Sequence, residues 1–183
     1  MKNLVIAKRY AKALFNLAQE DGKVEQYGQE LDAFVRLIGE LPDLSNAIQN
    51  PLYKEAARKS VFHSVADRMG LTPIIKSFIN LLIGKKRVQN VAEIAEYYHK
   101  LIDIHANIAR AQIKAATSLD EGVIEEIAQT LEKMTGKKVV VEFQQDKSLI
   151  GGVIAKIGDL VLDGSVRRQL LNFKETMKRG ALG

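Results

Sequence analysis

The sequence predicts an α+β protein in which an N-terminal all-α six-helix bundle is followed by a small mixed α/β domain. Over roughly the first hundred residues, apolar side chains recur three and four positions apart and are interrupted by Gly or Pro, which is typical of helices. Near Ala109 the period changes to two, as in half-buried strands. The 183 residues, 46% of them apolar, are enough for one large core or two small ones. We therefore expect two domains, residues 1–106 and 107–183.

Six helices are expected in the first domain, each ended by Gly, Pro or both. They should cover approximately residues 3–18, 24–38, 44–48, 54–69, 73–83 and 91–108. Thr72 followed by Pro73 is a typical start signal, an N-cap and then proline at the first helical position. The fourth helix should bury Ala57, Val61, Val65 and Met69. His105 falls on the apolar face of the sixth helix, where we expect a hydrogen-bonded core imidazole.

The fifth helix has more apolar residues than one stripe can hold. The expected core face consists of Ile74, Ile75, Phe78, Ile79 and Leu82. Leu81 and Ile83 would then point elsewhere. Either this helix is sandwiched between others, or it presents a second apolar surface.

The second domain should contain four strands and two helices. Strands are expected near 109–115, 139–143, 152–157 and 160–162. Ser118 and Glu121 match a capping box, and the helix that follows should bury Ile124, Ile127, Ala128, Leu131 and Met134. Strand, helix and strand in that order imply a right-handed crossover and parallel pairing. Gly158-Asp159 suits a two-residue type II′ hairpin turn. A last helix starts after Ser165 with Val166, Leu170, Phe173 and Met177 inward.

Composition excludes several classes of site. The chain has no cysteine, so it has no disulfide, thiolate zinc site or cysteine nucleophile. Its net charge of +5 permits an acidic partner but is too small to require nucleic acid. The longest apolar run, residues 74–83, is broken by polar residues and is too short to span a bilayer. An organelle transit peptide stays open as an alternative, because residues 1–19 are basic and lack acids, but this stretch also lacks serine and is better interpreted as a helix.

No catalytic, cofactor or metal site is expected. Neither Gly84-Lys85-Lys86 nor Gly136-Lys137-Lys138 has the Ser or Thr and the upstream Gly of a phosphate-binding loop. His63, His99 and His105 are not spaced as metal ligands are. Ser165 opens a helix, so we interpret it as an N-cap.

Three classes of function therefore remain. An RNA-binding or transcription adaptor would use the short basic clusters at Lys8-Arg9 with Lys12, Lys85–Arg87 and Arg167-Arg168, although solvated faces explain them better. An enzyme would need a polar pocket with perturbed titrating groups. A helix-binding surface would use the wide apolar face of the fifth helix and the alanine-rich first helix, although both could simply be buried in the bundle.

Several segments resemble one family along the whole chain. They are Ala7-Lys8-Arg9-Tyr10-Ala11-Lys12-Ala13-Leu14-Phe15, Asp146-Lys147-Ser148-Leu149-Ile150-Gly151-Gly152-Val153, Gly158-Asp159 and Asp163-Gly164-Ser165-Val166-Arg167. Together they closely resemble the delta subunit of F-type ATP synthase, the family of the oligomycin-sensitivity-conferring protein. The resemblance implies a non-catalytic stator subunit of the peripheral stalk, which holds the catalytic head still while the rotor turns.

The resemblance also implies partners. The helical domain would bind the N-terminal helix of an alpha subunit in a groove between the first and fifth helices, lined by Tyr10, Ala13, Leu14, Leu17, Phe78, Leu81 and Leu82. The second domain would meet the b-type stalk subunits and the catalytic head, with Gly164, Ser165, Arg167 and Leu170 as candidates for the stalk contact. No nucleic acid is expected. The chain would be a peripheral membrane protein on the cytoplasmic face of a bacterial inner membrane, attached only through the complex.

Overall fold

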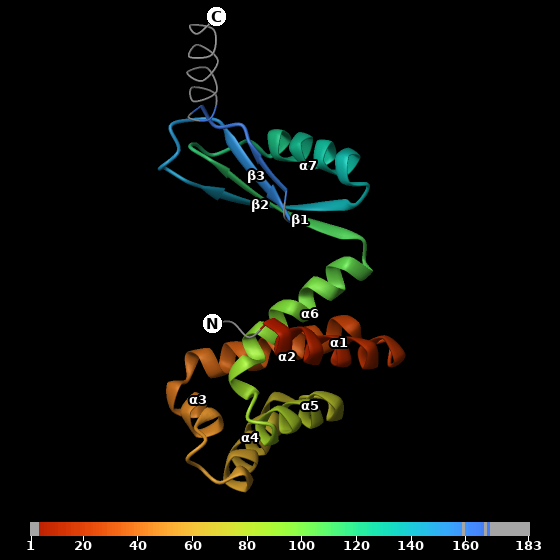
Figure 1. The fold of residues 1–183 in the computed structure, drawn as a ribbon, viewed down its shortest axis with the longest axis vertical. Helices are drawn as coiled ribbons and strands as arrows, with labels where there is room; N and C mark the ends of the chain where they lie inside the picture. Colours follow the sequence, from red (N-terminus) through yellow and green to blue (C-terminus); the bar gives the residue numbers. More distant parts are fainter. Residues whose placement is uncertain (1–3, 159, 167, 169–183) are drawn as a thin grey trace, which may run out of the picture. The chain divides into compact units, whose positions relative to one another are not determined.

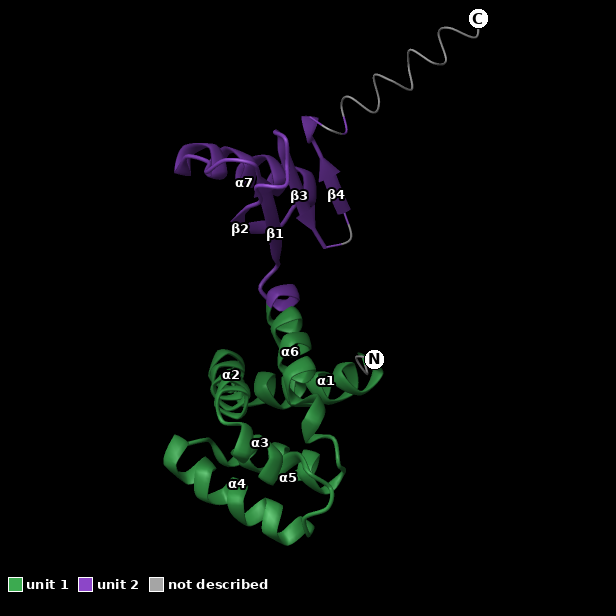
Figure 2. Ribbon diagram, turned by 90° about the vertical axis from the view of Figure 1, so that its left-hand side faces the viewer, with its two compact units in different colours: residues 1–102 green, residues 103–183 purple. Residues whose placement is uncertain are grey.

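Figure 1 shows the computed structural model, which describes residues 4–158, 160–166 and 168. Within these residues the fold is α+β, with seven α-helices, a short 3₁₀ helix and a four-stranded mixed sheet. The chain divides into two compact units, residues 1–102 and 103–183 (Figure 2). The expected domain boundary, between residues 106 and 107, lies a little further along, just after the sixth helix ends.

The first unit is helical and has a single apolar core. Its elements are α1 (Leu4–Glu20), α2 (Val24–Glu40), α3 (Pro42–Gln49), α4 (Glu55–Met69), α5 (Pro73–Gly84), the 3₁₀ turn η1 (Val88–Asn90) and most of α6 (Val91–His105). All six α-helices contribute buried side chains to this core. Edge-to-face aromatic pairs join distant helices: Phe15 of α1 packs on Tyr98 of α6, and Phe34 of α2 packs on Phe62 of α4.

The start of α5 is fixed from outside the helix. Pro73 is its first residue and Thr72 its N-cap, as the sequence predicts, but the Thr72 side chain makes no capping bond to the helix. Instead, the backbone N–H and the hydroxyl of Thr72 both donate to Oε2 of Glu30 on α2, at 2.8 and 2.9 Å. The carboxylate therefore ties the first turn of α5 to α2.

The core face of α4 differs from the prediction. The sequence predicts burial of Ala57, Val61, Val65 and Met69, whereas the structure buries Arg58, Phe62 and Ala66 and leaves Ala57 and Val61 exposed. Two contacts fix this rotation of the helix. Phe62 packs against Phe34, and Nε of Arg58 donates to the carbonyl of Ile48 on α3 at 2.7 Å. The prediction was wrong because an arginine was not counted among core residues.

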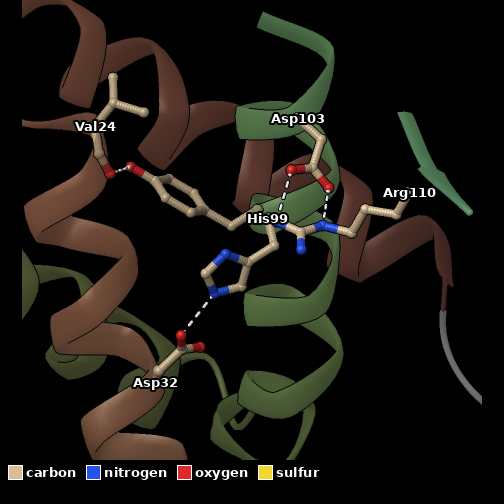
Figure 3. Close-up of polar contacts among 6 residues, drawn as sticks. Val24, Asp32, His99, Asp103 and Arg110 are labelled. Atoms are coloured by element: carbon tan, nitrogen blue, oxygen red, sulfur yellow. Dashed lines mark hydrogen bonds and ion pairs between the residues drawn. The ribbon is translucent and has the colours of Figure 1, made fainter. Parts of the chain in front are cut away.

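Polar contacts hold α6 in place (Figure 3). The hydroxyl of Tyr98 donates to the carbonyl of Val24 at 2.9 Å, and Nε2 of His99 lies 2.7 Å from Oδ2 of Asp32. His105 is exposed, so its expected place in the core was wrong. The helix ends at His105, and the chain turns at Asn107, with φ +54°, before the first strand.

The second unit follows the predicted order of elements. It contains β1 (Ile108–Ala115), α7 (Glu121–Thr135), β2 (Lys138–Gln145), β3 (Val153–Ile157) and β4 (Leu160–Asp163), with strand order β2-β1-β3-β4. The predicted parallel pairing of β1 with β2 is confirmed, and the other pairs are antiparallel. Pairing of Ile157 with Leu160 leaves the expected two-residue turn, in which Gly158 has φ +56°. α7 covers one face of the sheet, where Leu131 packs with Ala111, Val139 and Ile157 (Figure 1).

Two details of α7 differ from the prediction. The N-cap is Asp120 and no side-chain cap bond forms, so the Ser118 capping box was wrong. Met134 is exposed, because α7 ends one residue later, at Thr135, and Leu131 supplies its last buried contact with the sheet. Helical structure begins again at Val166, while Leu170, Phe173 and Met177 of the expected last helix lie outside the described residues.

Candidate helix-docking surface

The structure brings the two predicted docking helices together at one aromatic contact. The ring of Tyr10 on α1 stands edge-on to that of Phe78 on α5, with centroids 6.4 Å apart and an interplanar angle of 70°. Tyr10 is half-buried, and Phe78 is a core residue with 8% of its surface exposed. These two rings therefore join the exposed residues of α1 to those of α5.

Three of the predicted residues are exposed on either side of this pair. On α1, Ala13 is exposed and Leu17 retains 45% of its surface. On α5, Leu81 retains 48%, which confirms that it lies off the core stripe. Exposed leucines are costly only when they are many and contiguous, so these few are compatible with a stable free protein.

Besides Phe78, two predicted lining residues belong to the core and have no exposed surface. Leu14 and Leu82 are completely buried, one turn away from Tyr10 and Phe78 respectively. They support the docking helices from within, and a partner cannot reach them without a rearrangement. From here on, the docking surface means Tyr10, Ala13 and Leu17 of α1 with Phe78 and Leu81 of α5.

The side of α5 that carries Ile83 is more buried than the sequence predicts. Ile83 was expected to point away from the core, yet it is fully buried, which corrects that expectation. The buried set on α5 is therefore wider than predicted: Ile75, Phe78, Ile79, Leu82 and Ile83. Leu81 is the one large apolar side chain of α5 that stays exposed.

A shallow hollow next to Leu81 was not predicted. It lies between α4 and α5 and is lined by Glu55, Lys59, Ser77, Asn80, Leu81, Gly84 and Lys85. Within it, Nζ of Lys59 lies 2.6 Å from Oε1 of Glu55, and this hydrogen bond lowers the pKa of Glu55. Gly84 permits the close approach, because a Cβ there would come within 3.1 Å of Glu55. The i,i+4 spacing of Glu55 and Lys59 indicates that they can pair, but the hollow itself depends on how α4 packs against α5, which the sequence alone does not give.

The C-terminal candidates have a structural role in the described part of the chain. Gly152 has φ +82° and crosses the backbone of residues 164–165 so closely that a Cβ would lie 2.4 Å from the carbonyl oxygen of Gly164. Ser165 is buried, and the N–H of Arg168 donates to its hydroxyl at 3.3 Å, which confirms it as an N-cap. Its own N–H donates to Asp163, and hydrogen bonds from Ser165 lower the pKa of that carboxyl. Arg167 and Leu170 lie outside the described residues.

The histidines have ordinary structural partners. Nε2 of His63 lies 3.1 Å from Nδ2 of Asn80, and His99 pairs with Asp32. Among the described residues, no three His, Asp or Glu side chains are grouped so that they could hold a metal ion. In the same residues, none of the helices combines the length and the apolar character needed to cross a membrane.

Comparison with known proteins gives one consistent result. The family model "ATP synthase delta (OSCP) subunit" matches residues 6–177. A protein of Syntrophobacter fumaroxidans named ATP synthase subunit delta is 70% identical over the full length of both chains, and one of Desulfosudis oleivorans is 45% identical over 98% of each. A chain of the Toxoplasma gondii mitochondrial ATP synthase hexamer has a similar fold, with a TM-score of 0.65 over 93% of this chain and 96% of that one at 18% identity.

Proposed function

The chain belongs to the ATP synthase delta (OSCP) subunit family, and from this premise we propose how its two units serve the complex. It is a non-catalytic subunit of the peripheral stalk of an F-type ATP synthase. The observation that carries this assignment is the 70% identity, over both full lengths, with an ATP synthase subunit delta. The alternatives of an RNA-binding adaptor and an enzyme are set aside on the same ground.

We propose that the helices α1–α6 act together as a bundle that binds the N-terminal helix of an alpha subunit on the docking surface. The half-exposed Leu17 and Leu81 support this, since covering each would contribute about 1 kcal/mol. The Tyr10–Phe78 contact supports it too, because it gives the surface a preformed centre. A preformed surface loses little conformational entropy on binding.

We propose that the second unit meets the b-type stalk subunits and the catalytic head, so that the chain links the head to the membrane-anchored stalk. A stator must resist torque without doing chemistry. Several simultaneous interfaces achieve this, because each raises the effective concentration of the others and slows dissociation. The location that follows is the cytoplasmic face of a bacterial inner membrane, reached through the complex alone.

A peptide titration tests the docking surface. The probe is a synthetic peptide with the N-terminal residues of the alpha subunit from the same organism, titrated into the full chain by calorimetry. The variant is Leu81→Glu, which places a carboxylate in the covered apolar contact. The matched control is Leu41→Glu, since Leu41 is also 48% exposed but lies between α2 and α3, away from the docking surface.

Leu81→Glu should weaken peptide binding by at least about tenfold, while Leu41→Glu should leave the affinity unchanged. Both melting temperatures should stay close to that of the wild type, as for most exposed substitutions. Equal affinities for the two variants would remove Leu81 from the interface. A large drop in melting temperature confined to Leu81→Glu would assign Leu81 to the core.

A further inference from the structure

The turn after α5 carries three cations that form no ion pair with any residue the structure describes. Lys85, Lys86 and Arg87 follow Gly84 directly and are all exposed. Among the residues that the structure describes, no carboxylate lies within ion-pair distance of them, whereas Lys59 and Lys76 are each paired with an acid at 2.6 Å. Lys85–Arg87 are called the basic turn below.

The backbone holds the basic turn in a fixed shape. The backbone N–H of Lys85 donates to the carbonyl of Leu81 at 2.9 Å, and the backbone N–H of Arg87 donates to the carbonyl of Leu82 at 2.7 Å. Lys86 has φ +57°, the left-handed conformation that glycine adopts without strain. A charged side chain is thus present where glycine would close the helix more easily, and strain of this kind often accompanies function.

The basic turn is continuous with the docking surface. Lys85 is the C-cap of α5 and follows Leu81 by four residues, and both line the hollow between α4 and α5. Two other charges line that hollow, Lys59 and Glu55, and they pair with each other. Lys85 helps to lower the pKa of Glu55 but forms no ion pair with it, so among the described residues it is the cation of the hollow that is not directly paired with an acid.

We propose that the docked helix carries an acidic side chain three or four residues from the apolar side chain that covers Leu81, and that this carboxylate pairs with Lys85. The inference rests on the docking proposed above and specifies its partner chemistry. Lys86 and Arg87 add to the positive potential at the same end of α5. The part of the docked helix that carries this carboxylate then lies at the C-terminal end of α5. The charge pair therefore sets the direction in which the helix binds.

The test compares two double charge reversals in the full chain. Lys85→Glu/Lys86→Glu changes the basic turn. Lys8→Glu/Lys12→Glu makes the same change of net charge at two exposed lysines of α1, on the side of that helix away from Tyr10. Each protein is titrated with the same alpha-subunit peptide, and with a copy whose Asp and Glu are replaced by Asn and Gln, between about 0.02 and 0.5 M ionic strength.

At low ionic strength the basic-turn variant should lose about tenfold or more in affinity for the acidic peptide, and its residual binding should no longer depend on salt. The α1 variant should keep most of its affinity, and the amide peptide should bind the wild type and the basic-turn variant equally. Equal losses in the two variants, or equal binding of both peptides to the wild type, would overturn the inference. If Leu81→Glu still weakens binding in that case, the docking proposal stands without it. If the wild type binds neither peptide, the docking proposal fails and this inference fails with it.

Discussion

Gly152→Ala should destabilise the α/β unit strongly, because the chain crosses itself at this glycine. A Cβ at position 152 would lie 2.4 Å from the carbonyl oxygen of Gly164 and 2.8 Å from Cα of Ser165. Both are backbone atoms, so neither can move aside as a flexible side chain could. The backbone at residue 152 and the backbone at residues 164–165 would have to move apart.

The size of the effect follows from two contributions. A left-handed backbone with a Cβ costs about 1 to 2 kcal/mol, and Gly152 has φ +82°. Opening the crossing also weakens two hydrogen bonds, from Val166 N–H to Gly151 at 3.0 Å and from Gly164 N–H to Val153 at 2.9 Å, each contributing about 1 kcal/mol. We therefore expect a loss of about 3 to 4 kcal/mol.

Two other glycines of the same unit are matched controls. Gly158 has φ +56° and no atom within 4 Å of an added Cβ, so Gly158→Ala should cost only the conformational 1 to 2 kcal/mol or so. Gly122 lies in α7 with no atom near its Cβ position, so Gly122→Ala should stabilise by up to about 1 kcal/mol. Urea unfolding measures the free energies, and amide hydrogen exchange assigns the loss to β3 and β4. If Gly152→Ala lies within about 0.5 kcal/mol of Gly158→Ala, the crossing contributes nothing beyond its φ angle.

The remaining predictions concern the helical unit. Arg58→Ala should cost about 2 to 4 kcal/mol in urea unfolding, because a side chain only 3% exposed loses its packing and the carbonyl of Ile48 loses its donor; a loss below about 0.5 kcal/mol would contradict this. Lys86→Gly should raise the free energy of unfolding by about 1 kcal/mol, since it removes the left-handed strain, and an unchanged melting temperature would contradict that. The hydrogen bond to Asp21 raises the pKa of Tyr27 to about 12, so the associated stability is complete below pH 10 and is lost as the pH rises through about 12. In an absorbance titration, Tyr27→Phe should remove one tyrosine transition near pH 12, and a spectrum that loses a transition near pH 10 instead would refute the assignment.

The α/β unit was predictable because its signals are local. Alternation at Ala111, Ile113 and Ala115 places one face of β1 in the core, and the structure buries all three. Glycine at the hairpin predicts the pairing of β3 with β4, and the strand-helix-strand order predicts the parallel pairing of β1 with β2. None of these inferences requires knowledge of a distant part of the chain.

The helical unit was less predictable because the orientation of a helix depends on its neighbours. The mixed composition of α4 allowed two faces, and Arg58 is buried only because Ile48 of α3 offers a carbonyl. Ile83 was misplaced for a related reason, since one helix cannot reveal how many others surround it.

The docking surface, too, was only partly predictable from the sequence. The exposure of Leu81 followed from the phase of α5 alone and is confirmed. Leu14 and Leu82 entered the predicted set through family resemblance, which does not distinguish a residue on a surface from the core residue beneath it. The hollow that includes Lys85 depends on contact between α4 and α5, so the sequence by itself could not place it.

The central claim is that this chain attaches the catalytic head to the stalk through the docking surface. The direct measurement starts from membranes of the same organism stripped of this subunit and of the head, to which the head is added with wild-type chain, Leu81→Glu or Leu41→Glu. We expect the wild type and Leu41→Glu to restore both head binding in sedimentation and proton-driven ATP synthesis, and Leu81→Glu to restore much less of each at equal concentration. Head binding and ATP synthesis that are equally high without added chain, or with Leu81→Glu, would contradict the account.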